Sequence, residues 1–213
     1  SDGTFSNVNL NSMNLTGRYF QYRASFFSPE TVITPDLQNV LINYQIQDTE
    51  PPNLTILSPV ANTNYTSSSI LVNISAADSN LNLVWFYNGS TNITYTAPVF
   101  HTFAQGNITL IAYANDTFGN INSTNVSFFV DSIGPVLTIA HPQNITYGTN
   151  LSLPLNFTVR DTTSGVISCW FNVDNGQNNS LANCQNTTFN VNSHGSHTLF
   201  LFSNDTLNNN GNA

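Results

Sequence analysis

The chain of 213 residues contains no lysine and only three arginines, and charged side chains make up just 7% of it. Because nucleic-acid binding needs basic side chains that neutralise phosphates, this composition excludes a nucleic-acid-binding protein. No stretch approaches about 18 uninterrupted apolar residues, so no membrane span is expected. The absence of lysine also excludes isopeptide cross-links between lysine and asparagine, within or between subunits.

Residues that would support catalysis are also scarce. Glu30 and Glu50 are the only glutamates and lie in different segments, which gives little support to a glycosidase-type carboxylate pair. No serine occupies a nucleophile turn of the kind that Ser–His–Asp hydrolases use. His194 and His197 stand three residues apart without helix signals, so we expect them to be surface polar residues. The sequence therefore predicts that the protein is not an enzyme.

Small polar residues are abundant instead. Asparagine, threonine and serine together account for 82 of the 213 residues, and 35 of these are asparagine. At the same time 40% of the chain is apolar and 12% is aromatic, which is unlike a disordered chain. With so few charges, solubility must rest on amides, hydroxyls and attached sugars.

The asparagines fall in an unusual number of Asn-x-Ser/Thr sequons, which are acceptors for N-glycosylation. For this composition chance gives roughly eight sequons. The chain has sixteen, at Asn14, Asn53, Asn64, Asn73, Asn88, Asn92, Asn107, Asn115, Asn122, Asn125, Asn144, Asn150, Asn156, Asn178, Asn186 and Asn204. The excess predicts covalent glycans and an extracellular or cell-surface location. The alternative is that these residues only form the solvated face of a secreted β protein.

Ten of the sequons have an apolar or aromatic residue in the middle. Side chains of a strand alternate between two faces, so such a sequon points its asparagine outward and its middle residue into the core. Short alternations of this kind recur along the chain, and no long segment has a helical period. The sequence therefore predicts an all-β protein.

The chain contains an internal repeat, because residues 49–131 align with residues 131–213. Matching pairs are Val72-Asn73-Ile74-Ser75 with Leu155-Asn156-Phe157-Thr158, Trp85-Phe86 with Trp170-Phe171, and Asn115-Asp116-Thr117 with Asn204-Asp205-Thr206. In the first unit, strands are expected near 53–58, 69–77, 83–88, 92–96, 98–104, 107–115 and 124–130. A buried tryptophan on the third strand and an aromatic residue late in the sixth favour an Ig-like sandwich.

Two tracts in the first unit carry a resemblance to a known family. They are Asp48-Thr49-Glu50-Pro51-Pro52 and Ala112-Tyr113-Ala114-Asn115-Asp116-Thr117-Phe118-Gly119-Asn120. With them, about three quarters of the chain resembles the Ig-like repeats of large archaeal and bacterial surface proteins. The resemblance implies tandem Ig-like β-sandwiches at 49–131 and 132–213, in an extracellular setting. The second unit departs from it with Asn208-Asn209-Asn210 where the first has Gly119-Asn120-Ile121.

Residues 1–48 do not belong to the repeat. They contain two expected strands, at 17–24 and 37–44, which resemble the closing strands of jelly-roll modules. A hairpin of this size is only marginally stable alone and needs a partner. This N-terminal β segment is therefore predicted to be part of a jelly-roll-like module or a region that donates a strand.

The second unit is predicted to lack its last strand. When the units are aligned on their Asn-Asp-Thr tracts, Ala213 corresponds to Thr124, whereas the first unit continues through 125–130. A sandwich without its last strand exposes an unpaired edge and part of its core.

Two explanations remain open for this pattern. Subunits can assemble head to tail into a filament, with an N-terminal strand such as Thr4–Leu10 completing the next subunit's open sandwich. Alternatively, the chain is a piece of a longer adhesin-like or S-layer-like repeat protein. Such a protein would bind glycans or cells through aromatic residues such as Tyr19, Phe20 and Tyr22.

Cys169 and Cys184 are the only cysteines of the chain. Gly176-Gln177 lies midway between them, so a tight hairpin there would place them opposite each other, at a spacing that suits a disulfide. Such a bond would contribute roughly 3 kcal/mol. With no third ligand nearby, a metal-binding or reactive cysteine pair is not expected.

Seven of the eleven acids occur in three kinds of place: the linkers, the loops after the second strand and the loops after the sixth. They are Asp48, Glu50, Asp78 and Asp116 at the first unit, and Asp131, Asp161 and Asp205 at the second. In an Ig-like sandwich these places share one end, where oxygen ligands could hold Ca²⁺. The alternative is that aspartate simply caps turns. No other cofactor is expected.

Overall fold

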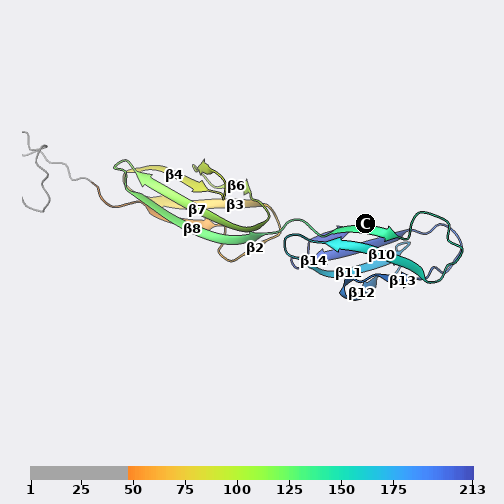
Figure 1. The fold of residues 1–213 in the computed structure, drawn as a ribbon. Helices are drawn as coiled ribbons and strands as arrows, with labels where there is room; N and C mark the ends of the chain where they lie inside the picture. Colours follow the sequence, from red (N-terminus) through yellow and green to blue (C-terminus); the bar gives the residue numbers. More distant parts are fainter. Residues whose placement is uncertain (1–47) are drawn as a thin grey trace, which may run out of the picture. The chain divides into compact units, whose positions relative to one another are not determined.

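The computed structural model describes residues 48–213, and these form two β-sandwiches with no α-helix among them (Figure 1). Several predictions fall outside the described residues. These are the strands at 17–24 and 37–44, the donor segment Thr4–Leu10, the aromatic residues Tyr19, Phe20 and Tyr22, and the sequon at Asn14.

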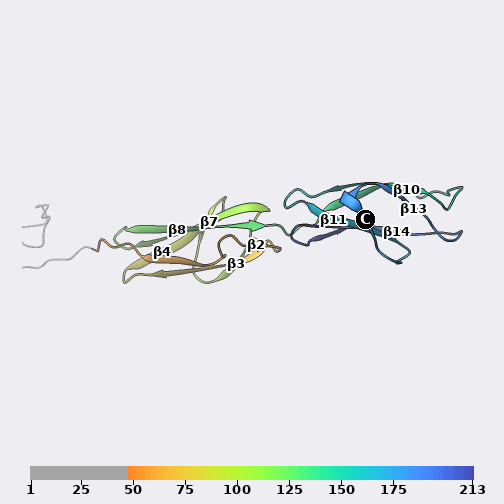
Figure 2. The same ribbon diagram turned by 90° about the horizontal axis from the view of Figure 1, so that it is seen from below.

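The first sandwich consists of two sheets that form separate layers (Figure 2). One sheet has the order β1-β3-β6, made of β1 (Asn53–Ser58), β3 (Ser69–Ala77) and β6 (Val99–Thr102). The other has the order β2-β8-β7-β4-β5, made of β2 (Asn64–Tyr65), β8 (Ile121–Val130), β7 (Gly106–Asp116), β4 (Leu81–Tyr87) and β5 (Asn92–Thr94). All neighbours are antiparallel except β2 and β8. Two sheets joined in this way make the all-β sandwich that the sequence predicts.

Alternating side chains build the core of this sandwich. In β3, Ile70, Val72 and Ile74 are buried, while the residues between them face outward to varying extents. They meet Leu110 and Phe86 of the opposite sheet in one apolar cluster. The period of two that the sequence shows is therefore what separates the core face of each sheet from its solvent face.

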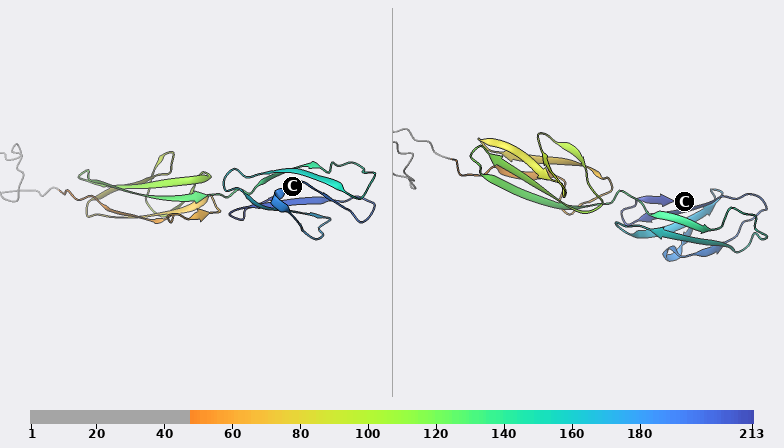
Figure 3. Two further views of the ribbon diagram at one scale, coloured as in Figure 1. Left: turned by 60° about the horizontal axis from the view of Figure 1, so that its bottom comes forward. Right: turned by 45° about the horizontal axis from the view of Figure 1, so that its top comes forward.

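The second sandwich repeats this plan (Figure 3). One sheet has the order β13-β10-β9, made of β13 (Thr187–Phe189), β10 (Leu153–Arg160) and β9 (Val136–His141). The other has the order β12-β11-β14-β15, made of β12 (Asn179–Leu181), β11 (Val166–Val173), β14 (Leu199–Asp205) and β15 (Asn210–Asn212). A short 3₁₀ turn, η2 (Ala182–Cys184), follows β12. The apolar core of this sandwich is separate from that of the first.

The prediction of a buried tryptophan on the third strand is wrong. Phe86 is completely buried, so its neighbour Trp85 must point to the opposite face of β4, where it is half-buried and stacks on Tyr113 at 5.3 Å. Trp170 stacks in the same way on Phe202, at 5.7 Å. Each sandwich therefore presents a stacked aromatic pair on its outer face, because one residue of register decides which aromatic side chain enters the core.

The prediction that the second unit lacks its whole last strand needs correction. β15 pairs with β14 from Asn210 to Asn212, at the positions that Ile121–Ser123 take in the first sandwich. β8 starts three residues earlier than the sequence suggests, so the aligned position in the second unit also carries the start of a strand. The start of the last strand is therefore present within residues 48–213.

Candidate functional site

Three aspartates of the first sandwich come together from distant parts of the sequence. Asp48 precedes β1, Asp78 follows β3 and Asp116 is the last residue of β7. One carboxylate oxygen from each lies within 4.8 Å of those of the other two. Asp116 is 1% exposed, and the other two are half-buried. We call this group the first acidic cluster.

The second sandwich assembles the same group. Asp131 precedes β9, Asp161 follows β10 and Asp205 is the last residue of β14, and their carboxylate oxygens again lie within 4.8 Å of one another. Asp131 and Asp205 are completely buried, and Asp161 is half-buried. This second acidic cluster and the first occupy equivalent positions in the repeat, so the fold produces the arrangement twice.

In each cluster, one asparagine joins two of the three aspartates. In the first sandwich, the Asn120 side-chain amide donates to Oδ2 of Asp116 at 2.6 Å and to the backbone carbonyl of Asp48 at 3.0 Å. The amide thus ties the linker before β1 to the loop after β7. The sequence analysis did not identify this residue, although its position four residues after the cluster aspartate recurs in both units.

Asn209 makes the same two bonds in the second sandwich, to Oδ2 of Asp205 at 2.8 Å and to the carbonyl of Asp131 at 2.9 Å. The residue before it also keeps its conformation, because Asn208 has a φ of 65° where Gly119 has 89°. Asparagine tolerates this left-handed region better than most side chains. The sequence difference between the two units therefore leaves the geometry of the loop unchanged.

The loops around the clusters use one aspartate oxygen as their hydrogen-bond acceptor. Oδ1 of Asp161 accepts the backbone N–H groups of residues 163, 164 and 165, at 2.9, 2.8 and 2.8 Å. Burial alone would raise the pKa of Asp161, but these donors hold that pKa below its ordinary value. For Asp116 burial likewise acts to raise the pKa, and the donors from Asn120 and Phe118 lower it. Both carboxyl groups are therefore ionised at neutral pH.

Six of the seven acids named from the sequence lie in the two clusters. The seventh, Glu50, is exposed and is not a member of either, although its backbone N–H donates to Oδ1 of Asp48. The aspartate oxygens would suit a hard divalent cation, and the structure shows no other group of this kind among residues 48–213.

The sequon asparagines among the described residues all reach the surface. The exposed ones are Asn53, Asn64, Asn92, Asn107, Asn125, Asn144, Asn178 and Asn186, and the half-buried ones are Asn73, Asn88, Asn115, Asn122, Asn150, Asn156 and Asn204. Middle residues such as Leu54, Ile74, Val126 and Phe157 are buried, as the strand alternation predicts. Ile145 and Leu151 are instead exposed, because their sequons lie in the loop between β9 and β10.

Some of these asparagines already use the amide nitrogen to which a glycan would be joined. Nδ2 of Asn122 donates to the carbonyl of Pro52 at 2.9 Å, and Nδ2 of Asn150 donates to the carbonyl of Val191 at 3.1 Å. Neither asparagine is fully exposed. The sixteen sequons are therefore not equivalent as acceptor sites.

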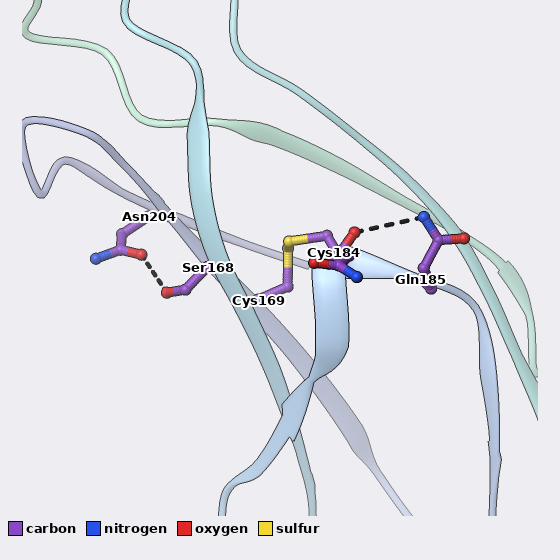
Figure 4. Close-up of a disulfide and its surroundings, with 6 residues drawn as sticks. Ser168, Cys169, Cys184, Gln185 and Asn204 are labelled. Atoms are coloured by element: carbon purple, nitrogen blue, oxygen red, sulfur yellow. Dashed lines mark hydrogen bonds between the residues drawn. A yellow bond between two sulfur atoms is a disulfide. The ribbon is translucent and has the colours of Figure 1, made fainter.

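The predicted disulfide between Cys169 and Cys184 is present, with a Cα–Cα distance of 5.2 Å (Figure 4). The predicted hairpin geometry is wrong, however. The cross-strand partner of Cys169 is Leu181, and Cys184 lies beyond β12 in η2. The bond therefore ties the 3₁₀ turn to the buried side of β11, instead of joining two opposite strand positions.

The two histidines do not form a shared site. His197 Nδ1 lies 2.7 Å from Oδ2 of Asp174 and its Nε2 lies 3.1 Å from the carbonyl of Ser193. The bond with Asp174 raises the pKa of His197, and the same bond lowers the pKa of Asp174. His194 is exposed. These residues behave as surface polar groups, as the sequence analysis expects.

Comparisons with known proteins give a structural likeness. No protein-family model and no curated protein matches the chain. Among solved structures, the chain is similar to fibronectin(III)-like modules of Clostridium thermocellum CbhA, with 19% identity and a TM-score of 0.34. The alignment covers 75% of this chain and 91% of that chain.

Among residues 48–213 there is no helix of the length and apolar character that crossing a membrane requires.

Proposed function

We propose that this chain is a structural subunit of a heavily N-glycosylated extracellular filament or surface fibre, assembled head to tail by strand complementation. The observation that carries the proposal is the repetition of one β-sandwich whose described sequon asparagines all reach the surface. Strand complementation is the proposed means of assembly, because one edge of β14 stays partly open among residues 48–213. The outward sequons and the disulfide support the extracellular setting, because disulfides persist in oxidising compartments. The role is mechanical and needs no catalytic residues.

The open edge follows from comparing equivalent strands. In the first sandwich β8 pairs with β7 along its whole length. Ile121 lies opposite Asn115 at one end, and Val130 lies opposite Gly106 at the other. In the second sandwich β15 pairs with β14 only from Asn204 to Phe202, and Ala213 continues the pairing to Leu201. No strand among residues 48–213 covers Leu199 on this side. Unpaired backbone groups of this kind are a template for an added strand.

The core shows the same deficit. Val126, Phe128 and Val130 of β8 are buried in the first sandwich, where they belong to a cluster of twelve buried residues. The second cluster has seven buried residues among residues 131–213, and the sequence reaches only Ala213, before the positions equivalent to these three. A strand that completes the second sandwich must therefore bring apolar side chains at alternate positions to this part of the core.

Thr4–Leu10 is the proposed donor in the neighbouring subunit. Its Val8 and Leu10 have the required spacing of two, although Phe5 is out of phase with them. The donor lies outside the described residues, so this assignment rests on sequence alone. The competing source is chain that follows the second sandwich directly, as in a longer repeat protein.

A peptide experiment tests strand complementation. The full chain should form fibres in negative stain, and a peptide of residues 1–15 in excess should shorten them at least ten-fold by capping open β14 edges. The matched control peptide carries Val8→Asp and Leu10→Asp and should have no effect, because charged side chains cannot enter the core. The proposal would be contradicted if neither peptide changed the fibre length, or if the full chain formed only single particles.

Glycan occupancy tests the surface part of the proposal. In protein from its natural source, we expect N-glycans at Asn107 and Asn125, which are exposed, and none at Asn122, whose Nδ2 is bound to the Pro52 carbonyl. Glycopeptide mass spectrometry measures this directly. As matched controls, Asn125→Gln should remove the mass of one glycan and Asn122→Gln should not change the glycan mass. If Asn107 and Asn125 carried no glycan, the sequon residues would be better explained as the solvated face of a β protein.

A further inference from the structure

We propose that each acidic cluster binds one Ca²⁺ ion, so that the chain takes up two ions, one in each sandwich. The inference does not depend on the fibre proposal, since a single isolated chain contains both clusters. The second acidic cluster carries the inference most directly, through the separation of its carboxylate oxygens and one buried oxygen without a partner. The first acidic cluster is included because it repeats the same arrangement in a sandwich without basic residues.

The separation suits a single ion. Ca²⁺ binds oxygen ligands at 2.3–2.6 Å, so two ligands on opposite sides of the ion lie roughly 5 Å apart. In each cluster the three carboxylate oxygens lie within 4.8 Å of one another. Three carboxylates supply part of the six to eight oxygens that Ca²⁺ takes, and loop carbonyls and water can supply the others.

Asp131 provides the second, independent observation. Its Oδ1 accepts the backbone N–H of Ile133 at 3.2 Å, but its Oδ2 is buried and accepts no hydrogen bond from the described residues. The whole residue is 0% exposed. A buried carboxylate oxygen without a donor is costly, whereas a cation in the second acidic cluster would satisfy it.

Among residues 48–213, no lysine or arginine side chain forms a salt bridge with either cluster. Residues 48–130 include neither lysine nor arginine, so the first acidic cluster lies in a sandwich without a permanent cation. The second sandwich has one arginine, Arg160, which forms no salt bridge; the ion pair found among residues 48–213 joins His197 to Asp174. Like charges this close repel one another, and a bound cation would offset that repulsion.

Turn capping explains only part of the arrangement. Asp78 and Asp161 each cap their own loop with Oδ1, which accepts the N–H of Asn80 at 2.6 Å in the first case and three N–H groups in the second. This leaves Oδ2 of both residues without a loop donor. Capping does not require three such residues to converge from three loops, and to do so in both sandwiches.

The direct test is calcium titration of the full chain after EDTA treatment and dialysis. Isothermal titration calorimetry should give two Ca²⁺ per chain, with Kd on the order of 10⁻⁴–10⁻³ M, as in other extracellular modules. At 10 mM Ca²⁺ the melting temperature should rise by about 5–15 °C. Mg²⁺ at the same concentration should give a clearly smaller rise, because it dehydrates reluctantly and demands a tighter octahedral site.

Isosteric variants locate the sites. Asp78→Asn and Asp161→Asn keep the Oδ1 acceptor that caps each loop and remove one charge. Each should reduce the stoichiometry from two ions to one. Asp174→Asn, outside both clusters, should leave it at two. The melting temperature separates loss of a metal ligand from a purely structural effect: the deficit of Asp161→Asn relative to the wild type should be clearly larger with Ca²⁺ than in EDTA, whereas a structural effect would be equal in both.

Three results would overturn the proposal. The first is no Ca²⁺-dependent heat or shift in melting temperature. The second is a stoichiometry of two Ca²⁺ per chain in the wild type that is unchanged in both Asp78→Asn and Asp161→Asn, since the ions would then bind elsewhere. The third is an equal shift with Mg²⁺, which would remove the assignment to Ca²⁺.

Discussion

Replacing Phe86 by alanine should lower the free energy of unfolding of the first sandwich by about 3–5 kcal/mol. Phe86 is 0% exposed and its ring lies edge-on to His101, with centroids 5.6 Å apart. A sandwich of roughly 80 residues has a total stability of about 4–12 kcal/mol, so the cavity removes a large part of it. Urea unfolding followed by circular dichroism measures the change.

Trp85→Ala is the matched control, since it removes a larger aromatic side chain one residue away. Trp85 is half-buried on the outer face and stacks on Tyr113, so we expect a loss of only about 1–2 kcal/mol. If Trp85→Ala cost more than Phe86→Ala, the assignment of Phe86 to the core and Trp85 to the surface would be wrong.

Removal of the disulfide should have the second large effect, confined to the second sandwich. The bond closes a loop with a sequence separation of 15 residues, and such a loop is worth about 3 kcal/mol. The double variant Cys169→Ala/Cys184→Ala should therefore melt about 10–20 °C lower in this sandwich. Alanine is chosen because Cys169 is 2% exposed, and a serine hydroxyl would be buried without a partner.

The first sandwich is the internal control for this experiment, because it contains no cysteine. Calorimetry of the wild type with a reducing agent should shift one transition and leave the other unchanged. A shift of both transitions, or of neither, would contradict a local stabilising role for the bond.

Strand positions could be predicted closely from the sequence. The structure has strands at Asn53–Ser58 and Ser69–Ala77, where the alternation places them, and the other predicted strands of the first unit differ by at most three residues at an end. The signal is strong because apolar and polar residues alternate along strands with one face in the core. The two-residue strand β2 (Asn64–Tyr65) was missed, since so short a segment has no period.

Other features depended on register and loop conformation. Trp85 and Phe86 are adjacent and both aromatic, so composition could not decide which of them enters the core; the pairing of β4 with β7 decides it. The bond of Cys169 was predicted, but the place of Cys184 was not. That cysteine lies in a 3₁₀ turn in which Asn183 has a φ of 51°, and no strand period describes such a turn.

The acidic clusters depend partly on local spacing in the sequence and partly on the tertiary structure. The sequence by itself determined that aspartates recur at equivalent loop positions in two β units, and that sequons present asparagine outward, because both follow from local spacing. Only the tertiary structure decided that Asp131, Asp161 and Asp205 meet within 4.8 Å and that Asn209 joins Asp205 to the backbone of Asp131. Such contacts join residues up to 78 positions apart, and it is the stacking of two sheets that brings those positions to one end of a sandwich.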